Sequence, residues 1–345
     1  MPPLITHLYT ADPSAHVFNG KIYIYPSHDR ETDIKFNDNG DQYDMNDYHV
    51  FSLDSLVDPV TSSASKPGAG GPKVTDHGVV LRTEDVPWAS KQLWAPDAAY
   101  CATTDKYVLF FPARDQQGIF RIGVATGDAP EGPFVPEENY LPGTFSIDPA
   151  VLVDDDADKT AYLYFGGLWG GQLQCYQKGH TDADYDASWA GAKEPSGPGV
   201  PAMGPRAARL SADLKTLASP VHEVTILDLA TGEPVAADDH EKRFFEAAWC
   251  HKRRGKYYFS YSTGDTHLLA YAVGDAPLGP FTYAGTLLAP VLGWTTHHSV
   301  VEFPVRSDRW WLFYHDCELS GGVDHLRSVK VKEIFYDGKG RIIGE

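Results

Sequence analysis

Ala11-Asp-Pro-Ser-Ala-His-Val-Phe-Asn-Gly-Lys-Ile-Tyr-Ile-Tyr25 is the stretch of sequence that decides the fold. A polar residue is followed by a short apolar strand, a turn, and a second strand rich in aromatic residues. This arrangement occurs five times along the chain, which indicates a radially repeated structure with its polar groups meeting near the axis. The leading polar residues are Asp12, Asp97, Asp148, Glu246 and His297, and the second strands are Gly20–Tyr25, Asp105–Phe111, Asp158–Phe165, Gly255–Tyr261 and Asp308–Tyr314.

Further segments predict how each hairpin continues. Ala125–Phe134 and Ala272–Phe281 match at eight of ten positions, and each is typical of a third strand that turns at Gly and Pro into a fourth. Asp47–Asp54 and Ala207–Asp213 occupy the equivalent place in the first and third repeats. Four strands per repeat predict an all-β fold, a five-bladed β-propeller with four-stranded antiparallel blades around a central channel.

The repeat fills the chain, so we expect residues 1–345 to form a single propeller domain. The predicted blades are residues 7–60, 88–140, 144–230, 242–290 and 294–345. Three insertions interrupt the period: Glu31–Asn46, Thr61–Lys73 and Gln177–Gly204. All three are typical of tolerated surface loops, and the first or the third could also overhang one face.

Composition excludes several classes of partner. The formal net charge of −18 disfavours nucleic acid and anionic membranes, and no apolar run is long enough to span a bilayer. The start of the chain has no basic and apolar leader, which favours a cytoplasmic protein. Cys101, Cys175, Cys250 and Cys317 are widely spaced, so we expect free, mostly buried thiols. The oligomeric state stays open.

The polar residues at the channel predict acid–base chemistry. Four carboxylates and one imidazole in one ring repel one another or need a counter-ion, and such repulsion raises at least one carboxyl pKa. Asp-Pro opens two of the repeats, at Asp12 and Asp148, and Glu246 lies within the apolar run Phe244–Trp249. Two carboxyls with unequal pKa values are what glycoside hydrolysis requires.

Each motif alone has an ordinary structural interpretation. Asp-Pro is a common turn, a buried glutamate can be a satisfied core group, and a histidine pair such as His297-His298 is more often packing than ligation. Trp94, three residues before Asp97, suits stacking against a sugar but is equally typical of a propeller core. The equivalent places of these residues in the repeat favour the functional interpretation.

Together these motifs resemble glycoside hydrolase family 43, five-bladed propeller enzymes that remove arabinose and xylose from hemicellulose. The matching segments are Ala11–His16, Leu93–Asp97, Ser146–Pro149, Phe245–Trp249 with Gly255–Ser262, and His297–Phe303 with Trp311–His315. The resemblance implies that Asp12 is the general base, Glu246 the general acid, and Asp148 the residue that tunes and positions the acid. It further implies that Arg327 reaches the sugar and that His297 binds a calcium ion, largely through water, with no organic cofactor.

We therefore predict an inverting, exo-acting hydrolase of small oligosaccharides. It would release xylose or L-arabinofuranose from xylooligosaccharides or arabinoxylan-derived oligosaccharides, in a pocket closed by the chain's own loops. The predicted substrate-binding residues are Trp94, Asp97, Phe245, His297 and Arg327. Two alternatives stay open: an endo-acting arabinanase with an open groove, and a non-catalytic propeller that binds carbohydrate.

Overall fold

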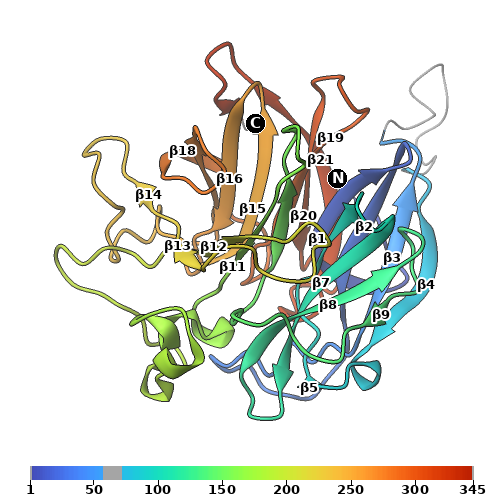
Figure 1. Ribbon diagram of the computed structural model, residues 1–345, viewed down its shortest axis with the longest axis horizontal. Helices are drawn as coiled ribbons and strands as arrows, with labels where there is room; N and C mark the ends of the chain where they lie inside the picture. The colour runs from blue at the N-terminus through green and yellow to red at the C-terminus, as the bar shows by residue number, and fades with distance from the viewer. Residues whose placement is uncertain (1, 57–71, 344–345) are drawn as a thin grey trace.

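The computed structural model describes residues 2–56 and 72–343, and its strands form five sheets, antiparallel apart from one two-residue pairing, arranged around an axis (Figure 1). The predicted all-β, five-bladed propeller is confirmed. The first blade contains β1 (Tyr9–Phe18), β2 (Lys21–Asp29), β3 (Asp47–Leu53) and β4 (Thr75–Arg82). The second contains β5 (Ala89–Lys91), β6 (Asp97–Cys101), β7 (Lys106–Asp115), β8 (Phe120–Gly127) and β9 (Val135–Pro136).

The other three blades follow in chain order. The third contains β10 (Ala150–Val153), β11 (Ala161–Phe165), β12 (Arg206–Arg209) and β13 (His222–Glu223). The fourth contains β14 (Ile226–Leu227), β15 (Glu246–Arg253), β16 (Lys256–Ser262), β17 (Leu269–Gly274) and β18 (Phe281–Leu288). The fifth contains β19 (His298–Glu302), β20 (Trp310–Asp316), β21 (Ser328–Tyr336) and β22 (Ile342–Ile343).

Each predicted hairpin joins the innermost strand of a blade to its aromatic neighbour. The second strands of the hairpins are β2, β7, β11, β16 and β20. All residues of β20 are buried, because this strand is covered on both faces and its apolar run is nearly continuous. Helical structure in the described part of the chain is limited to short 3-10 turns, η1 (Thr83–Asp85), η2 (Trp169–Gly171), η3 (Leu173–Tyr176), η4 (Asp182–Asp184) and η5 (Ala187–Trp189).

Two predicted blade boundaries are wrong. The first blade does not end at residue 60, because its fourth strand, β4, follows the second insertion. The third blade does not extend to residue 230, because β14 pairs in parallel with β18 of the fourth sheet. A two-residue strand has no periodicity of its own, so its partner is decided by tertiary packing. The predicted insertion Thr61–Lys73 lies largely outside the described residues.

The ring closes where the first and last blades meet. In Figure 1, β1 lies beside β19, β20 and β21, although these elements are far apart in sequence. The backbone N–H of Thr10 donates to the carbonyl of Arg327 (2.9 Å), and the N–H of Asp12 donates to Nδ1 of His315 (3.0 Å). Closure therefore places residues of β1 and of the β20–β21 region in direct contact at the axis.

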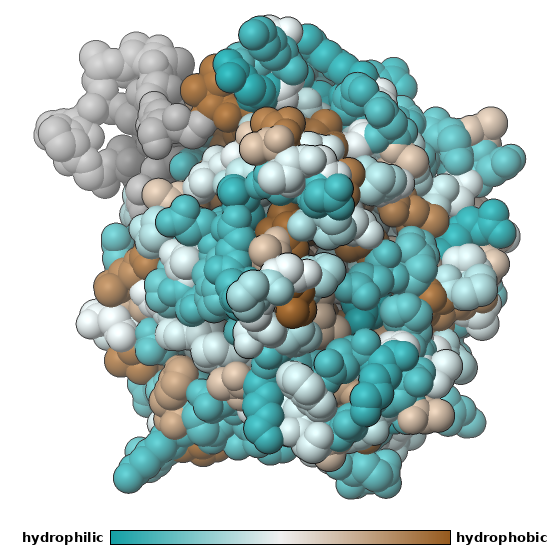
Figure 2. Space-filling view, turned by 90° about the vertical axis from the view of Figure 1, so that its left-hand side faces the viewer, coloured by the Kyte–Doolittle hydropathy of each residue, from teal (hydrophilic) through white to brown (hydrophobic). Residues whose placement is uncertain are grey.

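The polarity of the surface and the state of the cysteines match the expectations from the composition. On the face shown in Figure 2, hydrophilic side chains predominate and hydrophobic ones occur in small, separate groups. No helix within residues 2–56 and 72–343 has the length and apolarity needed to cross a membrane. All four cysteines are free and buried, as predicted.

Candidate functional site

The three carboxyl residues Asp12, Asp148 and Glu246 occupy irregular places at the innermost strands. Asp12 lies in a bulge of β1, Asp148 lies just before β10, and Glu246 begins β15 beside a second bulge. The backbone is left-handed at Asp12 (φ 50°), Asp148 (φ 55°) and Ala247 (φ 62°). Residues other than glycine adopt this conformation only when the surrounding structure imposes it, and bulges redirect side chains out of the regular alternation. The fold thus turns these carboxyls toward the axis.

One cavity at the axis collects these groups. It is lined by Asp12, Trp94, Ala95, Ile147, Asp148, Leu168, Trp169, Gly170, Gly171, Phe245, Glu246, Trp294, Thr295, His297 and Arg327. The insertion Glu31–Asn46 adds a wall made of Phe36, Asn37, Asp38, Gly40, Gln42, Tyr43 and Met45. Residues of Gln177–Gly204 do not line it. Of the two loops expected to close the pocket, the first does so.

Asp12 is held as an ionised carboxylate. Nη1 of Arg327 donates to its Oδ1 (3.0 Å), and the hydroxyl of Ser27 donates to its Oδ2 (2.7 Å). Burial by itself would raise the pKa of Asp12, but Arg327, His315 and the hydrogen bond from Ser27 outweigh burial and lower it below its usual value. Asp12 is therefore able to accept a proton near neutral pH.

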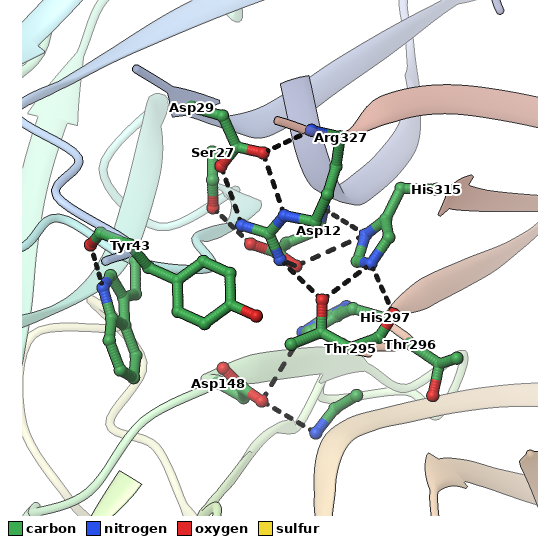
Figure 3. Close-up of polar contacts among 12 residues, drawn as sticks. Asp12, Ser27, Asp29, Tyr43, Asp148, Thr295, Thr296, His297, His315 and Arg327 are labelled. Atoms are coloured by element: carbon green, nitrogen blue, oxygen red, sulfur yellow. Dashed lines mark hydrogen bonds and ion pairs between the residues drawn. The ribbon is translucent and has the colours of Figure 1, made fainter. Parts of the chain in front are cut away.

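Arg327 is itself held rigidly (Figure 3). Its Nε and Nη2 donate to the two carboxylate oxygens of Asp29 at 2.9 and 2.8 Å, and its guanidinium lies 4.9 Å from the ring centre of Tyr43. Burial opposes the charge of Arg327, but Asp12 and Asp29 raise its pKa well above the usual value. The result is a permanent cation beside the carboxylates, in a fixed bidentate geometry.

The surroundings of Asp148 raise its pKa, whereas those of Asp12 lower the pKa of that residue. Oδ2 of Asp148 accepts a hydrogen bond from the backbone N–H of Ala247 (2.8 Å) and lies 3.8 Å from Nε2 of His297. Burial raises the pKa of Asp148 to about 6, with a further contribution from the Asp12 charge, against the lowering effect of His297 and Arg327. Asp148 is thus poised to change its charge near the working range of many enzymes.

The pKa of Glu246 is displaced upward. Burial raises its pKa well above the usual value, and the neighbouring charges of Asp148 and Asp12 raise it further. The prediction of a raised carboxyl pKa is confirmed, with burial as a larger cause than the predicted repulsion. The pKa of Glu246 is thus raised and that of Asp12 lowered, and both side chains line the same cavity.

Aromatic side chains form the walls of the cavity. Phe245, Trp169 and Trp294 lie with their ring centres 5.4–5.8 Å apart. Nε1 of Trp94 donates to the carbonyl of Tyr43 (2.8 Å), so Trp94 holds the loop that closes the pocket. The Tyr43 hydroxyl is buried without a hydrogen-bond partner. Apolar faces with a free hydroxyl suit a small ligand that carries both C–H and O–H groups.

Asp97 does not reach this cavity, although its repeat position predicted a substrate contact. Its carboxylate accepts hydrogen bonds from the hydroxyl of Ser14 and the backbone N–H groups of Ala98 and Val151, and lies 2.6 Å from Nε2 of His16. These partners occupy its oxygens and connect three neighbouring blades. Asp97 is therefore a buried structural carboxylate.

The other predicted residues, Trp94, Phe245, His297 and Arg327, all line the cavity. The sequence pattern did not predict Asp29, Tyr43, Trp169, Trp294 and Thr295. Asp29 had a usable signal, because it ends an aromatic strand two residues after Ser27, on the same face. The other four lie outside the regular strands, where the repeat gives no position.

Comparisons with known proteins agree with this geometry. The family model described as glycosyl hydrolases family 43 matches residues 73–342. The chain is 68% identical to "Xylosidase/arabinosidase 43A" of Humicola insolens, over 100% of this chain and 99% of that protein. It is 52% identical to a "Xylosidase/arabinosidase" of Bacteroides ovatus, over 97% and 94% of the two chains.

Solved structures give the same result. A GH43 β-xylosidase/α-arabinofuranosidase from a compost microbial metagenome, in complex with xylotriose and in calcium-free form, superposes with a TM-score of 0.89 at 52% identity. That match covers 100% of this chain and 97% of the other. A GH43_1 enzyme from Xanthomonas citri complexed with xylose gives 0.85 at 51% identity, over 100% and 93%.

Proposed function

Because the chain belongs to the glycosyl hydrolases of family 43, we propose that it is an exo-acting enzyme that releases xylose, L-arabinofuranose or both from short oligosaccharides. Support comes from relatives named xylosidase/arabinosidase and from similar structures in complex with xylose and xylotriose. The aromatic walls and the loop Glu31–Asn46 also favour a bounded pocket over an open groove. The activity would use the ends of xylooligosaccharides or of arabinoxylan-derived chains.

The proposed mechanism is inverting. Asp12 would take a proton from a water molecule that attacks the anomeric carbon, and Glu246 would protonate the departing glycosidic oxygen. Asp148 would raise the pKa of Glu246 by its charge and position it through the backbone of Ala247. Arg327 would keep Asp12 ionised and oriented. The observation that carries this assignment is the opposite pKa displacement of Asp12 and Glu246 in one cavity.

A calcium ion near His297 is part of this proposal. One similar structure is described as a calcium-free form. Nε2 of His297 is buried without a hydrogen-bond partner and faces Asp148, which fits a place for ordered water around a cation. Calcium prefers oxygen ligands, so His297 and Asp148 would hold it largely through water. When bound, it would add positive charge beside Asp148. Chelator dialysis followed by calcium add-back, with kcat and Tm measured in parallel, tests this part.

The stereochemical outcome tests the central assignment. Proton NMR during hydrolysis of a β-xyloside should show α-xylose as the first anomer formed, before mutarotation. First formation of β-xylose would contradict the roles of Asp12 and Glu246. A panel of nitrophenyl xylosides and arabinofuranosides, beside linear arabinan, separates the alternatives: cleavage of arabinan alone favours an endo-acting enzyme, and cleavage of none favours a binding module.

A further inference from the structure

A second cluster of polar side chains lies outside the cavity, on the first blade. His28 is the penultimate residue of β2, Asp47 is the first residue of β3, and His49 follows on the same strand. One nitrogen of each histidine and one oxygen of Asp47 lie within 4.8 Å of one another. Nδ1 of His28 lies 2.7 Å from Oδ1 of Asp47, and the two imidazole rings meet edge to face at 5.1 Å.

A second carboxylate orients one of these histidines. Oδ1 of Asp76 lies 3.0 Å from Nδ1 of His49, and the same oxygen accepts a hydrogen bond from the backbone N–H of Gly78 (2.7 Å). The other oxygen of Asp76 lies 2.8 Å from Nε2 of His7. A carboxylate at Nδ1 keeps the proton on that nitrogen, which leaves the lone pair of Nε2 available to a metal ion.

The cluster is enclosed but reachable. The exposed fractions of the side chains of His28, Asp47 and His49 are 19%, 19% and 13%. Its charges are the carboxylates of Asp47 and Asp76 and one cation, Arg82, whose Nη1 lies 3.9 Å from Oδ2 of Asp47. The carboxylates outnumber the nearby arginine, so a divalent cation would meet a favourable local charge.

We propose that His28, Asp47 and His49 form a zinc-binding site. Two imidazoles and one carboxylate are ligands that zinc accepts, and water would complete the tetrahedral shell. The ion would replace the proton now shared by His28 and Asp47, and Asp76 would act as the outer carboxylate that orients His49. The site would join the end of β2 to the start of β3, across the base of the loop 31–46 that walls the cavity.

Calorimetric titration of the chelator-treated full chain with zinc chloride tests the proposal. We expect saturable binding of one ion to this site, and a higher Tm in the presence of zinc because the ion binds only the folded state. His28→Gln and His49→Gln should each weaken this binding at least about tenfold, and Asp76→Asn should weaken it about 10- to 100-fold. His77→Gln is the matched control, because His77 lies on the adjacent β4 and bonds Ser52 instead of the cluster.

Cobalt in place of zinc adds a spectroscopic measurement. If the two histidines only stabilised the fold, their substitution would not change this spectrum. The visible absorption of cobalt should report histidine coordination in the wild type and in His77→Gln, and should be lost in His28→Gln and His49→Gln. Melting curves recorded with chelator show whether the variants stay folded. Equal zinc affinity in the wild type and both ligand variants would overturn the proposal, because the ion would then lie elsewhere. The absence of saturable zinc binding to the wild type would overturn it as well.

Discussion

Nη1 of Arg327 lies 3.0 Å from Oδ1 of Asp12, so a residue preceding β21 in the last blade fixes the orientation of a carboxylate in the first. The same guanidinium binds both oxygens of Asp29. These contacts cross the junction that closes the propeller. The ion-pair network at the candidate site is therefore also part of the closure of the ring.

Arg327→Lys should lower both stability and activity. Lysine keeps the positive charge but cannot make the bidentate pair with Asp29 and the bond to Asp12 together, so we expect a loss of about 1–3 kcal/mol in the free energy of unfolding. Arg309→Lys is the control, because its bidentate pair with Glu333 is partly exposed (41% and 25% of the two side chains) and should contribute less than about 1 kcal/mol. Urea titrations measure both, and equal losses would contradict the special role of Arg327.

Asp12→Asn and Glu246→Gln should each reduce kcat on xylobiose by at least about 100-fold. The two variants should differ with the leaving group. A dinitrophenolate leaves without protonation, so Glu246→Gln should recover much of its rate on the dinitrophenyl xyloside, whereas Asp12→Asn should not. Steady-state kinetics with both substrates check this, and the reverse pattern would mean that the two roles are exchanged.

The alkaline limb of the pH profile should depend on Asp148. Glu246 must be protonated to act as an acid, and the charge of Asp148 is one cause of its raised pKa. Asp148→Asn keeps an oxygen that can accept from Ala247 but removes this charge, so the pKa of Glu246 should fall and activity should be lost at lower pH than in the wild type. Profiles of kcat/KM against pH measure the shift. An alkaline limb that stays in place would exclude this coupling.

The position of a polar residue in the repeat predicts most of the residues that reach the cavity, but it also predicts Asp97, which does not reach it. Asp12, Asp148, Glu246 and His297 meet in one cavity because each lies near the start of an innermost strand, a region that the hairpin pattern defines locally. Asp12 lies in the bulge of β1, Asp148 and His297 just precede β10 and β19, and Glu246 begins β15. Asp97 stands at the same place, but the backbone N–H of Val151 and the side chains of Ser14 and His16 engage its carboxylate. Sequence spacing cannot distinguish these two orientations.

The cavity residues that lie on loops could be identified only from the structure. Tyr43 enters the cavity because Trp94, in another blade, holds its carbonyl, and Trp294 enters through contact with Phe245 and Trp169. No periodicity marks these positions. The strand that pairs with β14 could not be predicted from the sequence either. Two residues carry no register information, and the parallel pairing with β18 depends on how the blades pack.

Glu246→Gln should stabilise the protein while it removes activity. The folded chain keeps the proton on Glu246, whereas the unfolded chain releases it above pH 4.5, so folded wild type loses stability as pH rises from 4.5 toward its raised pKa. A glutamine at position 246 does not titrate. The free energy of unfolding of this variant should exceed that of the wild type by little at pH 4, and the difference should grow by up to about 1.4 kcal/mol per pH unit. Glu318→Gln should show the opposite sign, because Lys330 lowers the pKa of Glu318. Urea unfolding at several pH values compares them, and a pH-independent gain would indicate a packing effect instead.

Tyr43→Phe should separate substrate binding from stability. The hydroxyl of Tyr43 is buried beside Arg327 without a protein partner and faces the cavity, so a sugar hydroxyl is the partner it can still acquire. Removing it should lower kcat/KM on xylobiose about 3- to 10-fold, the equivalent of about one hydrogen bond, without lowering Tm. Tyr176→Phe removes another buried hydroxyl without a partner, from η3 outside the cavity, and should leave kcat/KM unchanged. If both variants behave alike, the Tyr43 hydroxyl does not contact substrate. If only Tyr43→Phe is impaired, the loop 31–46 supplies a binding group as well as a wall.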